Sequence, residues 1–151
     1  MTVSDRSHGG ARHDASGPLC AGLLRELGFD VGDVVVVPDE RPEIEAALAA
    51  GIRQGFDVVL TTGGTGFGPR DVTPEATLAV VDRQAPGLAE ALRQENRDKV
   101  PTTILSRAVA GIAGSTLVMN LPGSPGGVRD GIAVLAPVLG HAVDQLRGGD
   151  H

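Results

Sequence analysis

Aromatic residues are almost absent from this chain of 151 residues, which contains three Phe and neither Trp nor Tyr. The core must therefore be filled by aliphatic side chains, and a composition of 41% hydrophobic and 21% charged residues is typical of a globular protein. The length suits one domain, so we expect residues 1–151 to form a single domain. Few aromatic side chains also means few of the anchors that dominate protein-recognition surfaces.

Cysteine and lysine each occur once, as Cys20 and Lys99. A lone cysteine forms no internal disulfide, and its leucine-rich surroundings predict a small buried side chain in a reducing compartment. The formal net charge of −6 argues against nucleic acid or an anionic membrane as the main partner. Because arginine supplies nearly all the positive charge, we expect an anionic ligand to be held by arginine, backbone N–H groups or a metal ion. The sequence shows neither a signal peptide nor a membrane span, which favours a cytoplasmic protein.

Apolar runs and helical patterns alternate along the rest of the chain. Strands are expected at residues 34–37, 57–62, 109–114 and 115–120. Helices are expected at residues 16–27, 41–54, 73–82, 86–97 and 128–146, with Pro137 kinking or splitting the last one. This alternation predicts an α/β fold with a mostly parallel sheet and helices on both faces.

The beginning of the chain fits this pattern least well. Only Thr2 and Val3 precede the polar pair Ser4-Asp5, so the first strand is apparently truncated, either because it is stunted or because the natural start lies upstream of Met1. Residues 6–15 are polar, and their two histidines have no partners at metal-ligand spacing. We expect a mobile loop there, without a zinc site.

A glycine-rich loop follows the strand at residues 57–62 and places four glycines within six residues. The loop ends at Thr73-Pro74, which we expect to begin a helix with Thr73 as its N-cap. Glycine permits positive φ and turns backbone N–H groups toward an anion. The spacing matches neither the Walker A loop nor the dinucleotide-binding motif.

Polar residues follow each predicted strand: Asp5, Asp39, the loop at 62–71 and the glycine–proline loop at 120–127. The carboxyl ends of parallel strands share one edge of a sheet, where ligands bind in such folds. The N–H groups of the loops suit phosphate, and carboxylates beside phosphate require a bridging cation, for which Asp39 and Asp71 are the candidate Mg²⁺ ligands. This set favours phosphoryl or nucleotidyl transfer, which depends on positioning and charge neutralisation. Taken alone, Asp39 is also a common helix-start residue, and Ser4-Asp5 equally suits a solvated turn.

The run Thr61-Thr62-Gly63-Gly64-Thr65-Gly66, followed by Pro69-Arg70-Asp71-Val72-Thr73-Pro74, resembles the signature of the molybdopterin-binding fold. The resemblance extends to Val37-Pro38-Asp39-Glu40, Leu105-Ser106-Arg107 and Asn120-Leu121-Pro122-Gly123-Ser124. It is strongest to the bacterial molybdopterin adenylyltransferases of the MogA/MoaB type and to the N-terminal domain of gephyrin. The fold that it implies is a Rossmann-like arrangement of three layers.

The resemblance also implies an activity in molybdenum cofactor biosynthesis. Relatives of this type join molybdopterin to the AMP part of Mg-ATP and release pyrophosphate, so the substrates would be molybdopterin and ATP, with Mg²⁺ held by Asp39 and Asp71. The same two residues would be catalytic. Substrate would be bound by Ser4, Asp5, Thr62, Gly63, Gly64, Thr65, Gly66, Ser106, Asn120, Pro122, Gly123 and Ser124. A homotrimer is expected, and a downstream molybdenum insertase is a candidate partner.

Two other functions fit the same residues. A non-catalytic protein of the same family would bind molybdopterin in this pocket without reacting it. A scaffold would keep the fold but recognise a protein, which the scarcity of aromatic residues disfavours. Release of pyrophosphate from Mg-ATP in the presence of molybdopterin distinguishes the enzyme from the binding protein.

Overall fold

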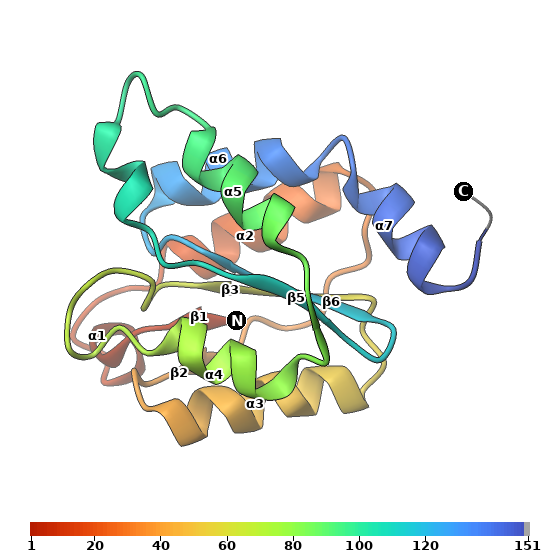
Figure 1. Ribbon diagram of the computed structural model, residues 1–151. Helices are drawn as coiled ribbons and strands as arrows, with labels where there is room; N and C mark the ends of the chain where they lie inside the picture. Colours follow the sequence, from red (N-terminus) through yellow and green to blue (C-terminus); the bar gives the residue numbers. More distant parts are fainter. Residues whose placement is uncertain (150–151) are drawn as a thin grey trace.

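The structure, a computed structural model that describes residues 1–149, is a six-stranded sheet between two layers of helices (Figure 1). The strand order is β2-β1-β3-β6-β5-β4, in which the first four strands are parallel and β5 and β4 run antiparallel to their neighbours. The predicted three-layer α/β fold with a mostly parallel sheet is confirmed. The strands are β1 (Thr2–Val3), β2 (Val36–Val37), β3 (Val58–Thr62), β4 (Arg83–Gln84), β5 (Ala110–Ala113) and β6 (Thr116–Leu121).

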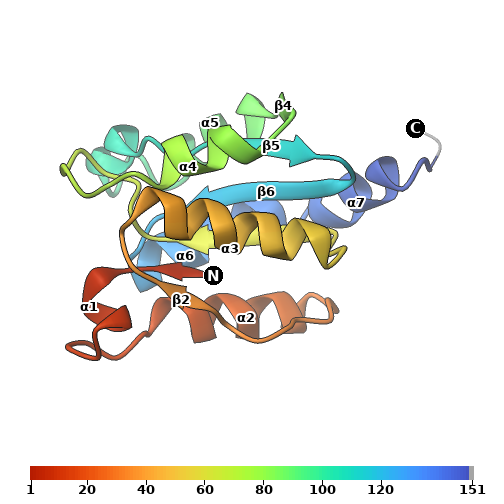
Figure 2. The same cartoon turned by 90° about the horizontal axis from the view of Figure 1, so that it is seen from below.

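Helices α2, α5, α6 and α7 cover one face of the sheet, and α3 and α4 cover the other (Figures 1 and 2). The helices are α1 (Asp5–His8), α2 (Ser16–Glu26), α3 (Arg41–Arg53), α4 (Thr73–Val80), α5 (Pro86–Gln94), α6 (Pro125–Leu135) and α7 (Leu139–Leu146), with a 3₁₀ helix η1 at Pro101–Leu105. No helix within residues 1–149 has the length and apolar character needed to cross a membrane.

Each face of the sheet carries its own aliphatic core because side chains alternate along a strand. In the fully buried strand β6, Leu117, Met119 and Leu121 pack under α2, α5, α6 and α7. Val118 points the other way and packs with Ile44 and Leu48 of α3. Apart from Cys20 and Met119, the buried residues of both cores within 1–149 are aliphatic, and Phe29 packs against the first core from a partly buried position. Cys20 is buried in the first core, as predicted.

Strands β3 and β6 bring the two glycine-rich loops together. They pair in parallel over five residues, from Val58 opposite Leu117 to Thr62 opposite Leu121, so both strands end at the same level. The N–H of Gly63 then donates to the carbonyl of Leu121 at 3.1 Å. The loops that follow these strands therefore start side by side at the carboxyl edge of the sheet.

Strand β1 lies between β2 and β3 although it spans only Thr2 and Val3. Thr2 pairs with Val36 on one side and with Thr62 on the other. The first strand is thus as short as the sequence suggests, but its carboxyl end is in register with its neighbours. Ser4 and Asp5 consequently emerge at the same edge as the glycine loop.

Several local predictions need correction. Thr73 is not the N-cap of α4, since Val72 holds that position and no side chain caps the helix. The predicted strand at 34–37 is reduced to two residues, and α5 ends at Gln94 rather than near residue 97. The edge strand β4 was not predicted because both of its residues are exposed and carry no apolar pattern. The last helix is split around Pro137 into α6 and α7, as expected.

Candidate functional site

An open cavity of about 310 Å³ lies at the carboxyl edge of the parallel strands. Six of the residues predicted to form the site line it: Ser4, Asp39, Thr62, Gly64, Asp71 and Gly123. They come from the ends of β1, β2, β3 and β6 and from the glycine loop, segments that are far apart in the sequence. Parallel pairing gathers them because each strand ends where its neighbour ends.

Asp5 and Asp39 hold each other through their backbones. The N–H of Asp5 donates to Asp39 Oδ2 at 2.8 Å, and the N–H of Asp39 donates to Asp5 Oδ1 at 2.9 Å. These bonds tie the end of β1 to the end of β2 and leave Asp39 Oδ1 beside Gly64. Asp5 itself does not line the cavity, so it acts on the site through Asp39.

The two carboxyl groups differ in their proton affinity because their surroundings differ. Burial, together with the nearby Asp5 and Asp71 carboxylates, raises the pKa of Asp39 above its ordinary value. The backbone N–H of Asp39, followed by the Arg70 guanidinium, lowers the pKa of Asp5. A group such as Asp39, whose charge is disfavoured beside a second carboxylate, is a natural ligand for a cation.

Arg70 anchors the far end of the glycine loop to the ends of β1 and β2. Its Nε and Nη2 contact the Asp5 carboxylate at 3.0–3.1 Å, and its Nη1 contacts Glu40 Oε1 at 2.7 Å. A planar guanidinium suits this double contact, which a lysine could not make. Arg70 thereby fixes the backbone immediately before Asp71.

Asp71 closes the glycine loop on itself. Its Oδ2 accepts from the N–H of Gly68 at 2.7 Å, and its own N–H donates to the carbonyl of Gly68 at 3.0 Å. A Cβ at Gly66 or Gly68 would come within about 3.0 Å of Asp71 Oδ2. The loop therefore needs small residues at these positions to let the carboxylate fold back into the cavity.

Gly63 and Gly64 are the two positions where the loop requires glycine. Gly63 has φ +100°, and a Cβ there would lie 2.3 Å from the carbonyl oxygen of Val3. Gly64 has φ +64°, and its Cβ would lie 2.2 Å from Thr73 Oγ1 and 3.2 Å from Asp39 Oδ1. The bare backbone thus passes directly between the acidic residue and the start of α4.

Two buried hydroxyls beside this backbone lack hydrogen-bond partners. Thr62 lines the cavity and Thr73 lies against Gly64, and the buried Oγ1 atoms of both find no partner among the described residues. Buried polar groups are normally satisfied, so such groups at a cavity mark a place for a polar ligand or water. Sequence reasoning selected Thr62 but read Thr73 only as a helix cap.

Arg107 secures the other side of the glycine loop. Its guanidinium donates to the backbone carbonyls of Gly66 and Asp71 and forms an ion pair with Glu75, while its backbone N–H donates to the carbonyl of Thr65 at 2.9 Å. The pKa of Glu75 is lowered by this arginine although burial opposes the shift. Arg107 is thus a fourfold attachment of the loop, a role that the sequence left undefined.

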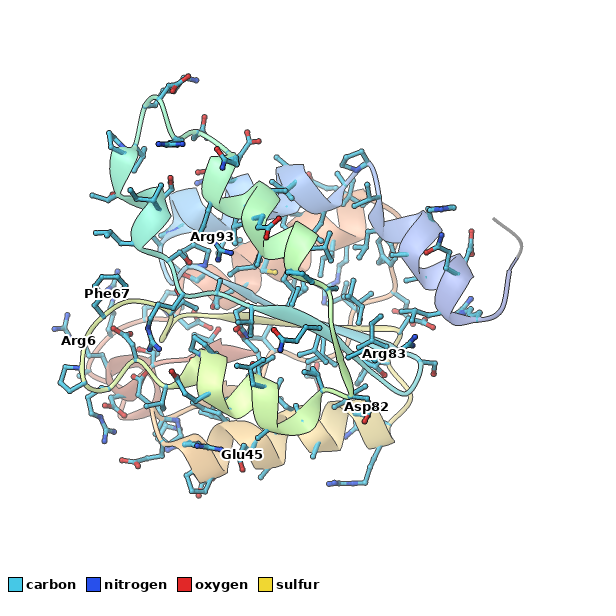
Figure 3. The ribbon with its side chains drawn as sticks, viewed as in Figure 1. Arg6, Glu45, Phe67, Asp82, Arg83 and Arg93 are labelled. Carbon is cyan, nitrogen blue, oxygen red and sulfur yellow. The ribbon has the colours of Figure 1, made fainter. Side chains whose placement is uncertain are left out.

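Arg93 holds the segment that carries Arg107. It reaches from α5 toward the sheet (Figure 3), where Nη1 donates to the carbonyls of Ser106 and Ala108 at 3.4 and 3.0 Å. The glycine loop is therefore braced from α5 through two successive arginines. Nothing in the spacing of the sequence signalled this arrangement.

The remaining predicted site residues lie outside the main cavity. Ser106 and Pro122 line a second cavity of about 40 Å³, next to Gly127 and Asp130. Ser124 caps α6 by accepting from the N–H of Gly127 at 3.1 Å. A Cβ built at Gly123, which lines the first cavity, would lie 3.1 Å from the Cα of Gly63, so the two loops are in close contact there.

Asn120 is completely buried and forms hydrogen bonds inside the protein. Its amide nitrogen donates to the hydroxyls of Thr61 and Thr77 at 3.1 and 2.8 Å, and its Oδ1 accepts from the N–H of Val109 at 3.2 Å. These three bonds join β3, β6 and α4 beneath the loops. Its expected contact with substrate stays a prediction, and the geometry gives it a supporting position instead.

One wall of the main cavity was not expected to contribute. Residues 6–15 were predicted to form a mobile loop, but Ser7, Arg12, His13 and Asp14 line the cavity together with Ser16. Asp14 fixes this wall by accepting from the N–H groups of Ser16 and Gly17 at 3.1 Å and from Thr2 Oγ1 at 2.8 Å. The available signal was position, since the segment directly follows β1 at the carboxyl edge.

The cavity offers two carboxylates to a metal ion. Among residues 1–149 no group of three or more His, Cys, Asp or Glu side chains is arranged to hold one. Asp39 and Asp71 nevertheless line the same cavity, and the Asp71 carboxylate contributes to raising the pKa of Asp39. Two carboxylates fit Mg²⁺, which commonly takes one or two carboxylates and completes its shell with phosphate oxygens and water.

Comparison with known proteins matches residues 1–141 to the family described as probable molybdopterin binding domain. The chain is 44% identical over 133 residues to a molybdopterin adenylyltransferase of Haemophilus influenzae, covering 86% of this chain and 68% of that protein. It is 42% identical over 151 residues to a molybdenum cofactor biosynthesis bifunctional protein of Synechococcus elongatus. A solved structure described as the anomalous substructure of MogA superimposes with a TM-score of 0.93 at 51% identity, covering 96% of this chain and 95% of that one.

The relatives differ in length. The match to the Synechococcus protein covers all of this chain but only 47% of that protein, so the chain spans about half the length of this bifunctional relative. A second bifunctional relative, from Chlorobaculum tepidum, is covered to 48%.

Proposed function

The chain belongs to the family of probable molybdopterin-binding domains, and on that premise we propose that it is a molybdopterin adenylyltransferase of molybdenum cofactor biosynthesis. The reaction joins molybdopterin to the AMP part of Mg-ATP and releases pyrophosphate. The proposal rests on one observation above all: Asp39, Asp71, Gly64 and Thr62, whose buried hydroxyl has no partner among the described residues, line a single cavity.

The transfer needs little covalent help from the protein. An oxygen of the terminal phosphate of molybdopterin attacks the α-phosphorus of ATP, the bond from the α-phosphorus to the bridging oxygen breaks, and the electron pair leaves with pyrophosphate. A phosphate oxygen is already a nucleophile, so the transfer requires no nucleophilic side chain of the protein. Catalysis then consists of alignment and charge neutralisation.

Each part of the site has a task in that alignment. The N–H groups of the glycine loop and the Thr62 hydroxyl can donate to phosphate oxygens. The resemblance assigns the pterin to a pocket that includes the glycine loop, Ser106 and Pro122, and the last two residues line the second cavity. The glycine loop would then present the pterin's phosphate to the nucleotide.

Asp39 and Asp71 would hold Mg²⁺ together with phosphate oxygens. When bound, Mg²⁺ supplies positive charge that offsets the charge developing on the phosphate oxygens. The protein contributes by keeping both carboxylates at fixed positions, Asp39 through Asp5 and Asp71 through Gly68 and Arg107. Burial and the nearby Asp5 and Asp71 carboxylates raise the pKa of Asp39, and a bound cation would offset the repulsion between these carboxylates.

The test replaces Asp71 by Asn and measures pyrophosphate release with molybdopterin and Mg-ATP. We expect a loss of at least about a hundredfold in turnover, with molybdopterin binding largely intact. The matched control is Asp82→Asn, because Asp82 Oδ2 also accepts one glycine N–H at 2.7 Å, from Gly114, but lies at the opposite end of the sheet (Figure 3). Unchanged turnover in the Asp71 variant would contradict the assigned role.

The same assay separates the two main candidates. Pyrophosphate release by the unaltered protein supports the enzyme, whereas binding of molybdopterin without release supports the binding protein. The homotrimer, the cytoplasmic location, the single-domain extent and the molybdenum insertase as partner stay predictions.

A further inference from the structure

Arg12 is a cation without a partner on the wall of the main cavity. Its side chain lines the cavity but makes no hydrogen bond or ion pair within residues 1–149, and only its backbone N–H is used, donating to the carbonyl of Arg6 at 3.0 Å. His13 lines the cavity beside it. An arginine held at a cavity wall with its guanidinium unpaired is available to an anionic ligand.

The other charged groups around the cavity already have partners. Asp14 is occupied by two backbone N–H groups and by the Thr2 hydroxyl. Arg70 is bound to Asp5 and Glu40, and Arg107 is bound to the glycine loop. Neither of these two arginines lines the cavity, so they hold the surrounding backbone in place. Arg12 does line the cavity, where a ligand would bind.

The charges inside the cavity are unevenly distributed. Asp39 and Asp71 supply negative charge, whereas the wall formed by residues 7–16 carries Arg12 and His13 beside Asp14, whose carboxylate already accepts three hydrogen bonds within the protein. A nucleoside triphosphate with one magnesium ion still carries net negative charge, which the two carboxylates repel. A second positive site, away from the carboxylates, is therefore needed to hold the end of the triphosphate.

We propose that Arg12 binds the β- and γ-phosphates of the nucleotide and stabilises pyrophosphate as it leaves. This inference rests on the proposed adenylyl transfer, in which the α–β bridging bond breaks and its electron pair passes to an oxygen of the β-phosphate. The charge that accumulates on that oxygen appears on the leaving group, where a guanidinium can donate two parallel hydrogen bonds. The wall of residues 7–16 is thus the leaving-group side of the cavity.

The test compares the binding of three magnesium-containing probes to the intact chain by calorimetry: pyrophosphate, ATP and AMP. Arg12→Gln should weaken the binding of pyrophosphate and of ATP by about tenfold to a hundredfold, since a hydrogen bond between charged groups is lost. AMP lacks the β- and γ-phosphates, so its affinity should change by less than about twofold. Arg12→Lys keeps the positive charge but not the paired N–H donors of the guanidinium. Its affinities for pyrophosphate and ATP should lie between those of the unaltered protein and those of Arg12→Gln.

Arg6→Gln is the matched control. Arg6 lies on α1, six residues earlier, and its exposed side chain extends away from the body of the protein (Figure 3) without lining the cavity. It removes the same charge from the same short segment, so it reports any general electrostatic effect. Its probe affinities should equal those of the unaltered protein.

The inference would be overturned if the unaltered protein did not bind magnesium pyrophosphate. It would also be overturned if Arg12→Gln reduced the affinities for AMP and ATP equally, or reduced neither. A reduction in Arg6→Gln equal to that in Arg12→Gln would overturn it as well. Weaker molybdopterin binding with unchanged pyrophosphate binding would also overturn it, because Arg12 would then serve the other substrate. The unaltered protein could release no pyrophosphate while Arg12→Gln still selectively weakens the binding of pyrophosphate and ATP. In that case the proposed reaction would be refuted, but the assignment of Arg12 as an anion-binding residue would be supported.

Discussion

The brace formed by Arg107 gives the sharpest prediction about how the site is held. Replacing Arg107 by Met keeps most of the aliphatic stem but removes the guanidinium that contacts Gly66, Asp71 and Glu75. The carbonyls of Gly66 and Asp71 would lose their donor, and Glu75, whose Oε2 is already buried without a partner, would lose its counter-ion. On this side the glycine loop would keep only the backbone hydrogen bond from residue 107 to the carbonyl of Thr65, while Arg70 would still hold the other side.

The expected loss of stability follows from these contacts. Two hydrogen bonds to backbone carbonyls contribute about 1 kcal/mol each, and the half-exposed ion pair with Glu75 adds up to about 1 kcal/mol. The free energy of unfolding should therefore fall by about 2–3 kcal/mol. For a domain of this size that corresponds to a fall in Tm of roughly 5–10 °C.

Urea denaturation and a magnesium titration of the pyrophosphate-release rate measure the two consequences separately. The magnesium concentration for half-maximal rate should rise in Arg107→Met, because Asp71 is less well positioned, and Arg107→Lys should recover only part of the loss. Arg83→Met is the control, since Arg83 is exposed on β4 and far from the glycine loop (Figure 3). A stability within about 0.5 kcal/mol of the control, with an unchanged magnesium requirement, would refute the brace.

Two further predictions concern the backbone and the acidic pair. Gly64→Ala should lower the free energy of unfolding by about 2–5 kcal/mol, because residue 64 has a positive φ and its Cβ would clash with Thr73 Oγ1. In the control Gly126→Ala the new Cβ meets nothing within 4 Å, so Tm should be unchanged or slightly raised. Asp39→Asn should stabilise the protein at pH 7 and Asp5→Asn should destabilise it, measured by denaturation across pH. Because folding raises the pKa of Asp39, protonated Asp39 stabilises the folded state below the ordinary carboxyl pKa. This contribution to the free energy of unfolding is lost as the pH rises through the raised value. Because folding lowers the pKa of Asp5, ionised Asp5 stabilises the folded state above the ordinary carboxyl pKa, and this contribution is lost as the pH falls through the lowered pKa. If the two variants changed the free energy of unfolding at pH 7 in the same direction, the assignment would be contradicted.

The sheet and its functional edge were predictable because they depend on periodicity and on topology. Apolar runs marked β3 and β6, and parallel pairing then required that Thr62 and Leu121 end at one level. Asp39 and Asp71 could be placed at a shared cavity from that rule alone, before any coordinate. Glycine spacing further identified the loop that has to pass close to another chain segment.

The parts that escaped prediction depend on long-range side-chain contacts. Arg107 and Arg93 carry no local pattern, and their roles appear only when η1 and α5 lie beside the glycine loop. Arg12 lies in a polar stretch that reads as a mobile loop, because nothing in its composition shows that Asp14 fixes the segment to β1 through Thr2. Thr73 was given the local role of a helix cap, which Val72 fills instead.

The arginines of the site divide by what they contact, and this division suggests how a strongly acidic edge can accept a polyphosphate. Arg70 and Arg107 are consumed by carboxylates and carbonyls of the protein, so they set the position of Asp71 without adding charge to the cavity. If all the arginines were committed in this way, two carboxylates would face the triphosphate with only one metal ion between them. Arg12 breaks that pattern, because it lines the same cavity and its guanidinium has no partner within residues 1–149. A cavity that holds both carboxylates and an unpaired guanidinium favours a ligand that binds a cation and still carries free negative charge, which is the charge distribution of a magnesium nucleotide losing pyrophosphate.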